Sequence, residues 1–533
     1  MIKINQLKLP VGHSQKDLED KIRKTLRIPS KETFHYEVMR RSLDARKKPS
    51  LFYVYCIYVT IRQENSIVKK LHQPSVSLVT ETGYRFSEMG HERLNRRPVI
   101  VGAGPCGLFA AWQLTLAGYA PLILERGKQV EDRSADVERF WETGILQPDS
   151  NVQFGEGGAG TFSDGKLNTL VKDPIGRNRF VLETFVKFGA PEHILYENKP
   201  HIGTDILADV IKRMREFMTE NGVEFLFETC VTGFSTGKNG NLKSIELNHD
   251  RQIDTDCLIL AIGHSARDTF SLLQEKGLNM QAKSFAVGFR VEHPQSMINH
   301  AQYGDADMRY LPTAPYKLTA QTPVGRGVYS FCMCPGGYVV NASSEPGRLA
   351  VNGMSYQARD SRNANSAMIV TVTPEDFPDK GVLGGVEFQR DLEKKAWELG
   401  EGKIPVQLFG DFCKNQASEA LGEVTPCMKG EYILTNVRSV LPKAVGDSIE
   451  EGVIAFGKRI SGFDREDALL SGIESRTSSP VRIVRDQKLT ANMAGIYPCG
   501  EGAGYAGGIT SAAMDGIKVA ETVCRKYAAI KNN

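Results

Sequence analysis

The sequence predicts an α/β fold built on a parallel sheet, with a mostly antiparallel segment inserted into it and a small α+β module in front. Three observations predict this arrangement. A short apolar strand at 99–101 runs directly into a glycine-rich turn and a helix of small residues. A second apolar strand ends on glycine at 257–263, and glycine-rich sequence returns at 495–509 after a long strand-rich segment. Such alternation is typical of a parallel sheet covered by helices.

The first glycine-rich turn has the spacing of a dinucleotide-binding fingerprint. Gly102, Gly104 and Gly107 form GxGxxG between the strand and the helix. The first glycine allows a tight turn, the second lets the backbone approach a pyrophosphate, and the third lets the helix pack on the strand. The N-terminal N–H groups of the helix would then face the phosphates. We expect the intervening Pro105 and Cys106 to contact the cofactor as well.

An acidic residue stands where the fingerprint requires one. Glu125 ends the second apolar strand, 121–124, about twenty residues after the glycines, where a carboxylate accepts ribose hydroxyls. Arg126 follows directly, and Arg133 lies in the next expected helix, 129–143. We expect both arginines to contact the cofactor, and the sequence therefore predicts a dinucleotide site.

A second glycine-rich segment, 151–168, contains two motifs that we reject. The GxGxxG at 155–160 has neither a strand before it nor an apolar helix after it, and the loop ending at Lys166 is followed by Leu167 where a P-loop needs a hydroxyl. A flexible surface loop is the alternative, but the apolar residues within the segment disfavour it. We interpret it as a loop close to a flat cofactor, with contacts from Gly158, Thr161 and Lys166.

Residues 1–95 predict a separate module. The order strand-helix-strand-strand-helix-strand suggests a split βαβ, ferredoxin-like sandwich. Residues 1–97 hold 20 Lys and Arg against 10 Asp and Glu, whereas the rest of the chain holds 46 against 53. The excess is compatible with nucleic-acid contact. A solvated surface is the favoured interpretation, because no RNA-stacking motif is present.

The composition indicates a globular protein of several domains. The chain of 533 residues is longer than one hydrophobic core supports. Its contents of 41% hydrophobic and 24% charged residues are ordinary for a globular protein. We place the domains at 1–95, 96–274, 275–480 and 481–533, the last being the return to the parallel sheet. No signal peptide and no run of the roughly 18 apolar residues that a membrane span needs is present.

The ten cysteines are scattered without a CxxC pair, which is typical of a reducing cytoplasm. We therefore expect a cytoplasmic protein without a membrane span. Cys332 and Cys334 have no matching cluster of His or Cys, so the sequence suggests no metal site. Both are interpreted as packing residues.

Together, the fingerprint, the 261–263 turn and the late pair Gly500–Glu501 resemble the two-domain FAD-dependent oxidoreductases of the glutathione-reductase superfamily. In those proteins the late motif usually reads Gly-Asp, so Glu501 is a departure. The resemblance implies FAD, with the fingerprint on its pyrophosphate, Glu125 on its ribose and Val231 beside its adenine. It also implies flavin-side contacts from Gly263, Gly500, Glu501, Gly507, Gly508 and Ile509.

Four blocks extend the resemblance over nearly the whole chain: 154–167, 199–205, 334–337 and 503–509. They resemble a bacterial family of long FAD-dependent dehydrogenases that carry a small N-terminal α/β domain and have no assigned substrate. The implied fold is a Rossmann-like FAD-binding domain with an inserted, mostly antiparallel β substrate or cap domain, preceded by the ferredoxin-like module.

The resemblance and one absence together narrow the expected reaction. A disulfide reductase of that superfamily needs a second nucleotide fingerprint and a CxxxxC or CxxC dithiol, and this sequence has neither. We expect one dinucleotide, FAD, and an oxidoreductase that passes a hydride between a small organic substrate and flavin N5, with reoxidation by a separate acceptor. A tRNA-modifying flavoprotein that uses the basic module and a non-catalytic flavin-binding scaffold are the alternatives.

Four residues are candidates for the substrate side. His264 follows the 261–263 turn and is either a general base or a structural histidine. Arg476 and Arg482 could hold the carboxylate of an anionic substrate bidentately, with ion pairs as the alternative. Tyr505, within the late glycine motif, could touch the ring. The substrate, the electron partner and the oligomeric state are left open by the sequence.

Overall fold

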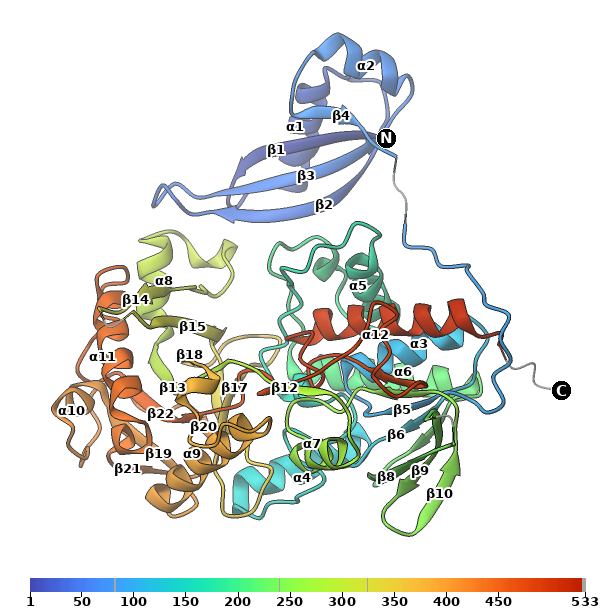
Figure 1. The fold of residues 1–533 in the computed structure, drawn as a ribbon. Coiled ribbons are helices and arrows are strands. Elements are labelled where there is room, and N and C mark those ends of the chain that lie inside the picture. Colours follow the sequence, from blue (N-terminus) through green and yellow to red (C-terminus); the bar gives the residue numbers. More distant parts are fainter. Residues whose placement is uncertain (81–82, 239, 324, 530–533) are drawn as a thin grey trace.

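The structure is a computed structural model that describes residues 1–80, 83–238, 240–323 and 325–529. It contains a small N-terminal module, a body built on a parallel sheet, and a second body built on a larger mixed sheet (Figure 1). Within these described ranges no helix combines the length and the apolar character needed to cross a bilayer.

The N-terminal module is one antiparallel sheet of four strands with two helices. The sheet order is β2-β3-β1-β4. The helix α1 begins at a capping box in which Ser14 and Asp17 bond reciprocally. Alternate residues of β1 face a core that is separate from the cores of the rest of the chain. The elements are β1 (Ile2–Pro10), α1 (Gln15–Leu26), β2 (His35–Asp44), β3 (Phe52–Thr60), α2 (Glu64–Leu71) and β4 (Val76–Leu78).

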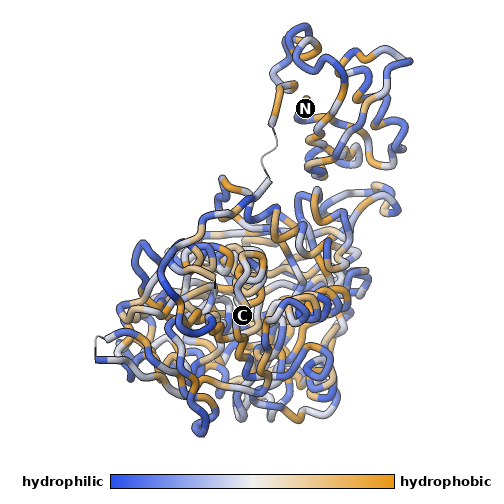
Figure 2. Tube along the Cα trace, turned by 90° about the vertical axis from the view of Figure 1, so that its right-hand side faces the viewer, coloured by the Kyte–Doolittle hydropathy of each residue, from blue (hydrophilic) through white to orange (hydrophobic). Residues whose placement is uncertain are grey.

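Figure 2 shows the module standing apart from the rest of the chain at one side of the molecule. Backbone and side-chain hydrogen bonds nevertheless join the two. The N–H of Arg41 donates to the carbonyl of Tyr196 at 2.7 Å, and the N–H of Asn198 donates to the carbonyl of Arg41 at 2.9 Å. The Tyr53 hydroxyl donates to the carbonyl of Tyr310 in the second body at 2.9 Å. The module therefore touches both bodies.

The segment after the module is not a free linker. The N–H of Gly90 donates to the carbonyl of Cys524 at 2.7 Å, and the N–H of Ala528 donates to the carbonyl of Glu92 at 2.9 Å. An ideal Cβ on Gly90 would lie 2.3 Å from the carbonyl of Lys526, so only glycine fits there. This segment follows the C-terminal end of the last helix.

The first body contains a parallel sheet of order β24-β11-β5-β6-β7. Its strands are short and mostly buried on both faces, as in sheets covered by helices. The helices α3 and α12 approach closely, because an ideal Cβ on Gly516 would lie 2.1 Å from the carbonyl oxygen of Cys106. The strands are β5 (Val99–Val101), β6 (Leu122–Leu124), β7 (Glu224–Leu226), β11 (Leu258–Leu260) and β24 (Ile496–Pro498).

Helices and one antiparallel meander surround this sheet (Figure 1). The helices are α3 (Pro105–Leu116), α4 (Val130–Thr143), α5 (Arg177–Lys187), α6 (Thr204–Glu220), α7 (Arg267–Glu275) and α12 (Ile509–Lys526). The meander consists of β8 (Val231–Thr236), β9 (Leu242–Leu247) and β10 (Arg251–Asp254).

The second body is built on seven strands of order β14-β15-β18-β13-β22-β19-β21, in which only the β19–β21 pair is parallel. These are β13 (Phe285–Pro294), β14 (Thr319–Gln321), β15 (Gly327–Cys334), β18 (Asn363–Val372), β19 (Ile404–Leu408), β21 (Tyr432–Leu434) and β22 (Leu469–Glu474). A smaller sheet contains β16 (Tyr338–Asn341), β17 (Val351–Met354) and β20 (Met428–Lys429).

Among the described residues of this second body, the α-helices are α8 (Gln295–Tyr303), α9 (Gly384–Gly400), α10 (Phe409–Lys414) and α11 (Lys443–Gly457). The chain leaves the first body and returns to it at one place, because β12 (Met280–Ala282) pairs antiparallel with β23 (Val481–Ile483).

Burial of Glu292 in the second body predicts a pH-dependent stability. Its side chain is fully buried, and one oxygen accepts hydrogen bonds from the Asn363 amide and the Cys427 N–H, both at 2.9 Å. Burial raises the pKa of Glu292 to about 7. Because the folded pKa lies above the unfolded value, the free energy of unfolding falls between about pH 4.5 and 7 and levels off above.

Glu292→Gln is expected to flatten this slope by up to one proton, about 1.4 kcal/mol per pH unit. Urea unfolding at a series of pH values measures it. Superimposable wild-type and E292Q slopes would contradict the assignment.

Candidate cofactor and active site

A cavity of about 510 Å³ lies at the carboxyl ends of β5, β6 and β11, where open α/β sheets bind their ligands. Its walls come from the fingerprint turn, the 153–168 loop, the 261–266 turn, the 501–512 segment and the second body. The sequence-predicted residues that line it are Gly102, Gly104, Pro105, Cys106, Glu125, Arg126, Gly158, Lys166, Val231, Gly263, His264, Arg476, Glu501, Gly507, Gly508 and Ile509.

The fingerprint brings the start of α3 to this cavity. Gly102 has a φ of +101°, as the tight turn requires, and no side chain caps α3 at Gly104. The uncapped N–H groups and the helix dipole favour a phosphate there. Gly107 does not line the cavity. An ideal Cβ on it would lie 1.9 Å from the carbonyl oxygen of Gly102, so this glycine allows the close packing of helix on strand.

Glu125 joins the fingerprint to the second glycine loop. One of its carboxylate oxygens accepts the N–H of Ala103 at 2.7 Å, and the other accepts those of Gly127 and Gly155 at 2.9 and 3.0 Å. The side chain is buried yet lines the cavity beside Arg126. The carboxylate therefore fixes the two loops on which a nucleotide would lie.

Glu125→Gln is expected to weaken FAD binding by about 10- to 150-fold, the equivalent of a charge-assisted hydrogen bond of about 1.5–3 kcal/mol. In the variant, the amide NH₂ group would face one of the three backbone N–H groups that the carboxylate accepts, and that hydrogen bond would be lost. Titration of the apoprotein with FAD, followed by fluorescence, measures the affinity. Wild-type affinity in E125Q would contradict this role.

Arg133 is a predicted cofactor contact that the structure places outside the lining. Its side chain is fully buried and donates to the carbonyls of five loop residues at 2.7–3.2 Å: Asn151, Val152, Gly155, Glu156 and Gly158. Burial lowers the pKa of Arg133 to about 10. The guanidinium shapes the glycine loop from behind.

Two further predicted contacts also lie behind the cavity wall. Thr161 is fully buried. An ideal Cβ on Gly500 would lie 2.7 Å from the sulfur of Cys106, so this glycine allows β24 to approach α3. Both support the wall without lining it.

The start of α12 is open toward the cavity and lies close to the start of α3, because an ideal Cβ on Gly160 would meet both Ile509, at 2.8 Å, and Pro105, at 3.7 Å. Gly508 precedes the helix without any side-chain cap, and an ideal Cβ on Gly507, Gly508 or Gly263 would meet no atom within 4 Å. This part of the cavity therefore has space next to uncapped N–H groups. Lys166 lines the same region and forms an ion pair with buried Asp164 at 2.6 Å.

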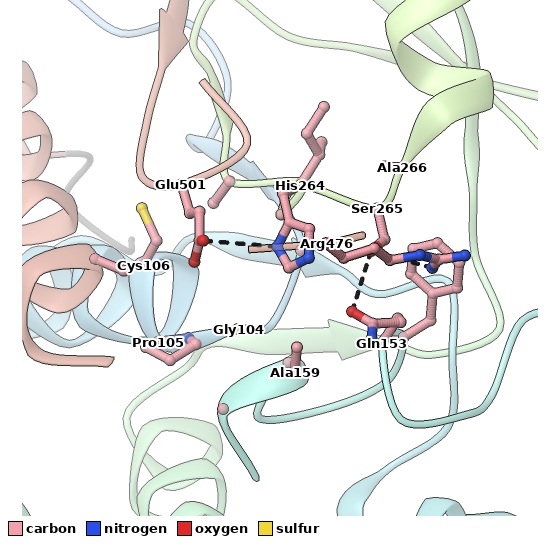
Figure 3. A pocket seen from close by; sticks show the side chains of 18 of the residues that line it. Gly104, Pro105, Cys106, Gln153, Ala159, His264, Ser265, Ala266, Arg476 and Glu501 are labelled. Atoms are coloured by element: carbon pink, nitrogen blue, oxygen red, sulfur yellow. Dashed lines mark hydrogen bonds and ion pairs between the residues drawn. The ribbon is translucent and has the colours of Figure 1, made fainter. Parts of the chain in front are cut away.

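Glu501 and His264 face each other across the cavity, above Gly104 and Pro105 (Figure 3). The His264 Nδ1 lies 3.7 Å from a carboxylate oxygen of Glu501, and its Nε2 has no hydrogen-bond partner among the described residues. Burial lowers the pKa of His264 to about 3 and raises that of Glu501 to about 7. The imidazole is therefore neutral, and the carboxyl group can exchange a proton near pH 7.

Arg476 lines the cavity, but the protein itself uses most of its donors. Two of its N–H groups bind Glu393 at 2.9 and 2.8 Å, and two more reach the hydroxyls of Ser265 and Ser344. With five N–H donors in a guanidinium, one remains for a ligand. Arg476 therefore forms an ion pair within the protein, which is the alternative that the sequence left open.

Arg482 and Tyr505 lie outside the cavity lining. Arg482 is exposed and donates to the carbonyl of Gly504 at 3.3 Å. The Tyr505 ring lies 3.8 Å from the Arg485 guanidinium, and its hydroxyl accepts the Arg485 N–H at 3.2 Å. The turn after Gly500 directs Tyr505 away from the cavity.

Sequence reasoning missed the wall that the second body contributes. Phe331, Cys332, Asn352 and Glu474 line the cavity, although they are far from the fingerprint in the chain. Burial raises the pKa of Glu474 to about 7. Cys332 is partly buried and is one of the residues that line the cavity, and its interpretation as a packing residue stays a prediction. The one available signal was two cysteines two residues apart on a strand that ends in Pro-Gly-Gly.

The donor set fits FAD. The cavity has two neighbouring helix N-termini without side-chain caps, glycines with open space, a ribose-type carboxylate at Glu125 and the unpartnered Nε2 of His264. Such a ligand would place its pyrophosphate on α3 and its adenine near Val231. The ring would lie near Gly507–Ile509.

Four family models match parts of the chain. They are a domain of unknown function (residues 1–60), an NAD(P)-binding Rossmann-like domain (100–139), a pyridine nucleotide-disulphide oxidoreductase (182–291) and a "FAD-dependent protein, C-terminal domain-like" (284–477). A protein of Clostridium beijerinckii, named "Uncharacterized protein", is 47% identical over 531 residues, 99% of each chain.

The solved structures that resemble this chain are distant from it. CtdE in complex with FAD shares 10% identity and a TM-score of 0.31, over 81% of this chain and 84% of that one. A geranylgeranyl bacteriochlorophyll reductase-like protein from Thermoplasma acidophilum shares 11% and 0.34, over 81% and 78%. The FrdA subunit of Escherichia coli quinol fumarate reductase shares 10% and 0.36, over 82% and 70%. These values do not bear on function.

The family models together with the cavity support FAD as the cofactor. The chain belongs to one family with the Clostridium beijerinckii protein. Its matched segments after residue 99 are domains of FAD-dependent oxidoreductases.

Proposed function

We propose that the protein is a FAD-dependent oxidoreductase that passes a hydride between a small organic substrate and flavin N5, with reoxidation by a separate acceptor. The observation that carries the proposal is a cavity whose lining combines a phosphate-type site at Gly104–Cys106 with side chains of the second body. A cofactor held at the fingerprint would therefore share the cavity with residues from outside the nucleotide-binding sheet.

Bound FAD would supply a two-electron carrier, and the chain would supply its surroundings. The open start of α12 favours negative charge at the edge of the ring. The second body contributes to the cavity wall and limits access of water. Glu474 and Glu501, both with a pKa of about 7, can take up or release a proton near neutral pH.

The charges of the wall favour an uncharged substrate over a carboxylate. Among the described residues, three cations line the cavity, and each already has a carboxylate partner. Arg126 pairs with Asp268, Lys166 with Asp164, and Arg476 with Glu393. A substrate anion would have to compete with these internal partners.

The domain roles are part of the proposal. The pairing of β12 with β23 supports the second body as an inserted cap, because the chain enters and leaves it side by side. The sheet order β2-β3-β1-β4 supports a ferredoxin-like module. The ten free cysteines support a cytoplasmic location.

The absorption spectrum of the purified protein tests the proposal first. A yellow protein whose flavin bleaches under anaerobic photoreduction, and recovers with an added acceptor, is expected. A folded protein that is colourless and takes up no added FAD would overturn it. A flavin that no donor or acceptor can reach would support the scaffold alternative.

A further inference from the structure

One face of the large sheet in the second body carries a polar row that consists of Arg290, Glu292, Asn365 and Ser471. Arg290 and Glu292 are two residues apart on β13, so their side chains share a face. Ser471 of β22 pairs directly across from Arg290, and Asn365 of β18 pairs directly across from Glu292. Residues that pair across strands also share a face. All four side chains are fully buried.

Glu474 joins the polar row to the cavity. It lines the cavity, and one of its carboxylate oxygens forms an ion pair with the Arg290 Nε at 3.2 Å. The other two nitrogens of the guanidinium donate to the carbonyl of Cys332, another lining residue, at 3.1 and 2.9 Å. Glu474 therefore contacts both the cavity and the buried guanidinium.

Asn365 links Arg290 to Glu292. An ideal Cβ on Gly353 of β17 would lie 2.0 Å from the Arg290 Nη2 and 2.6 Å from the Asn365 Oδ1, so these two groups are close neighbours. One oxygen of Glu292 accepts the two hydrogen bonds described above, and the other has no partner among the described residues. The row is therefore continuous from the cavity wall to Glu292.

Hydrogen-bonding capacity is left unused along this row. Buried polar atoms normally have partners, so each unpaired one needs an explanation. Within the part of the chain that the structure describes, the buried atoms without a hydrogen-bond partner include the Glu474 Oε2, the Arg290 Nε, the Ser471 Oγ, both amide atoms of Asn365 and the Glu292 Oε1. Such groups can serve a carboxyl group in its protonated form as well as in its ionised form.

The charges of the row do not balance when both carboxyls are ionised. Arg290 is one buried cation beside two carboxyls, and an uncompensated buried charge is strongly unfavourable. Burial raises the pKa of both Glu292 and Glu474 to about 7, and Arg290 opposes the rise in each case. Glu292 is also near the exposed Arg362, and Glu474 is near Cys332. One proton held between the two carboxyls would restore the balance.

The other charged groups of the cavity do not supply this balance. Lys166 and Arg476 line the same cavity, but each pairs with a carboxylate of its own. Glu501 faces His264 from the first body. The guanidinium on β13 therefore remains as the counter-charge of Glu474.

We propose that Glu474 and Glu292 share one proton beside Arg290, and that this proton moves from Glu292 to Glu474 when negative charge develops in the cavity. The inference rests on the proposed function, because reduction of bound FAD supplies that charge. An O–H bond breaks on Glu292 and one forms on Glu474, so the number of bound protons is unchanged and no electron is transferred. Arg290 then neutralises the new carboxylate of Glu292. Glu292 is thereby a positioning residue that acts on the cavity through Arg290 and Glu474.

Redox-induced infrared difference spectroscopy of the holoprotein tests this transfer, because a protonated carboxyl group has its own C=O band. Reduction of the flavin should produce one new band, from Glu474, and remove one, from Glu292. A fully reduced wild-type flavin without this pair of changes would overturn the inference and leave the proposed function standing. A folded protein without FAD, or with FAD that cannot be reduced, would instead overturn the proposed function.

Single variants assign the two bands. E292Q should lose the removed band and keep the new one, because Glu474 then takes its proton from solvent. E474Q should lose both bands, since Arg290 then keeps Glu292 ionised in either state of the flavin. D376N removes a carboxylate that pairs with Arg326 elsewhere in the second body, so it is the control and should keep both bands. A removed band that persists in E292Q would overturn the assignment.

Infrared pH titration of the apoprotein tests the shared proton without the flavin. In the wild type the two carboxyls should titrate in two steps, because ionisation of one opposes that of the other. In E292Q or E474Q the remaining carboxyl has Arg290 to itself, and it should titrate about one pH unit below the upper step of the wild type. D376N should titrate like the wild type. An unchanged upper step in both variants would overturn the shared proton.

Discussion

Replacing Arg133 by methionine is expected to lower the free energy of unfolding by about 3–5 kcal/mol and to abolish retention of FAD. The substitution leaves five loop carbonyls without their donor, and these carbonyls are enclosed by protein. Unpaired buried polar groups cost about 1–3 kcal/mol each, and relaxation of the loop recovers part of this. The glycine loop that covers the fingerprint would lose its shape.

Urea unfolding and the ratio of bound FAD to protein measure the two effects. Arg133→Lys keeps the charge but replaces a planar fork with a single ammonium, so it should recover only part of the stability. Arg139, half-exposed on the same helix and paired with Asp136, provides the control. R139K should lose less than about 1 kcal/mol. R133M with wild-type stability and a full complement of FAD would contradict the role of Arg133.

Features with a local cause could be predicted from the sequence. The GxGxxG turn, the strand before it and the carboxylate that follows obey a fixed spacing along the chain, and the structure places Gly102, Gly104 and Glu125 at the cavity. The element order of the N-terminal module likewise follows local patterns of hydrophobicity. Spacing of this kind reflects backbone geometry, so it needs no knowledge of distant contacts.

Features with a distant cause could not be predicted. Arg133 was predicted to contact the cofactor, but the direction of its side chain is set by carbonyls of residues 151–158 that fold around it. Cys332 reaches the cavity only because the second sheet packs against the first body. Tyr505 does not line the cavity, because its ring packs against the Arg485 guanidinium. Sequence motifs do not encode these tertiary partners.

The charge cluster behind Arg476 gives the other large expected effect. Glu393 is fully buried and binds both Arg267, at 2.6 and 2.9 Å, and Arg476, at 2.9 and 2.8 Å. Glu393→Gln would leave two buried guanidinium groups without a full counter-charge. Breaking a buried ion pair on one side costs about 3–5 kcal/mol, so a loss of this size in the free energy of unfolding is expected.

The cost should persist across about pH 5–9, because the two arginines hold the pKa of Glu393 well below its usual range. A carboxylate with a lowered pKa contributes its stability above the unfolded value of 4.5 and loses it only in stronger acid. Glu345 supplies the matched control, since it is partly exposed and lies 3.3 Å from the same Arg267. E345Q should cost about 1 kcal/mol or less, since a screened pair is worth little. Equal losses of unfolding free energy in E393Q and E345Q would contradict this prediction, because burial of the charge would then not set the cost of the substitution. In that case packing alone would hold Arg476 beside the cavity.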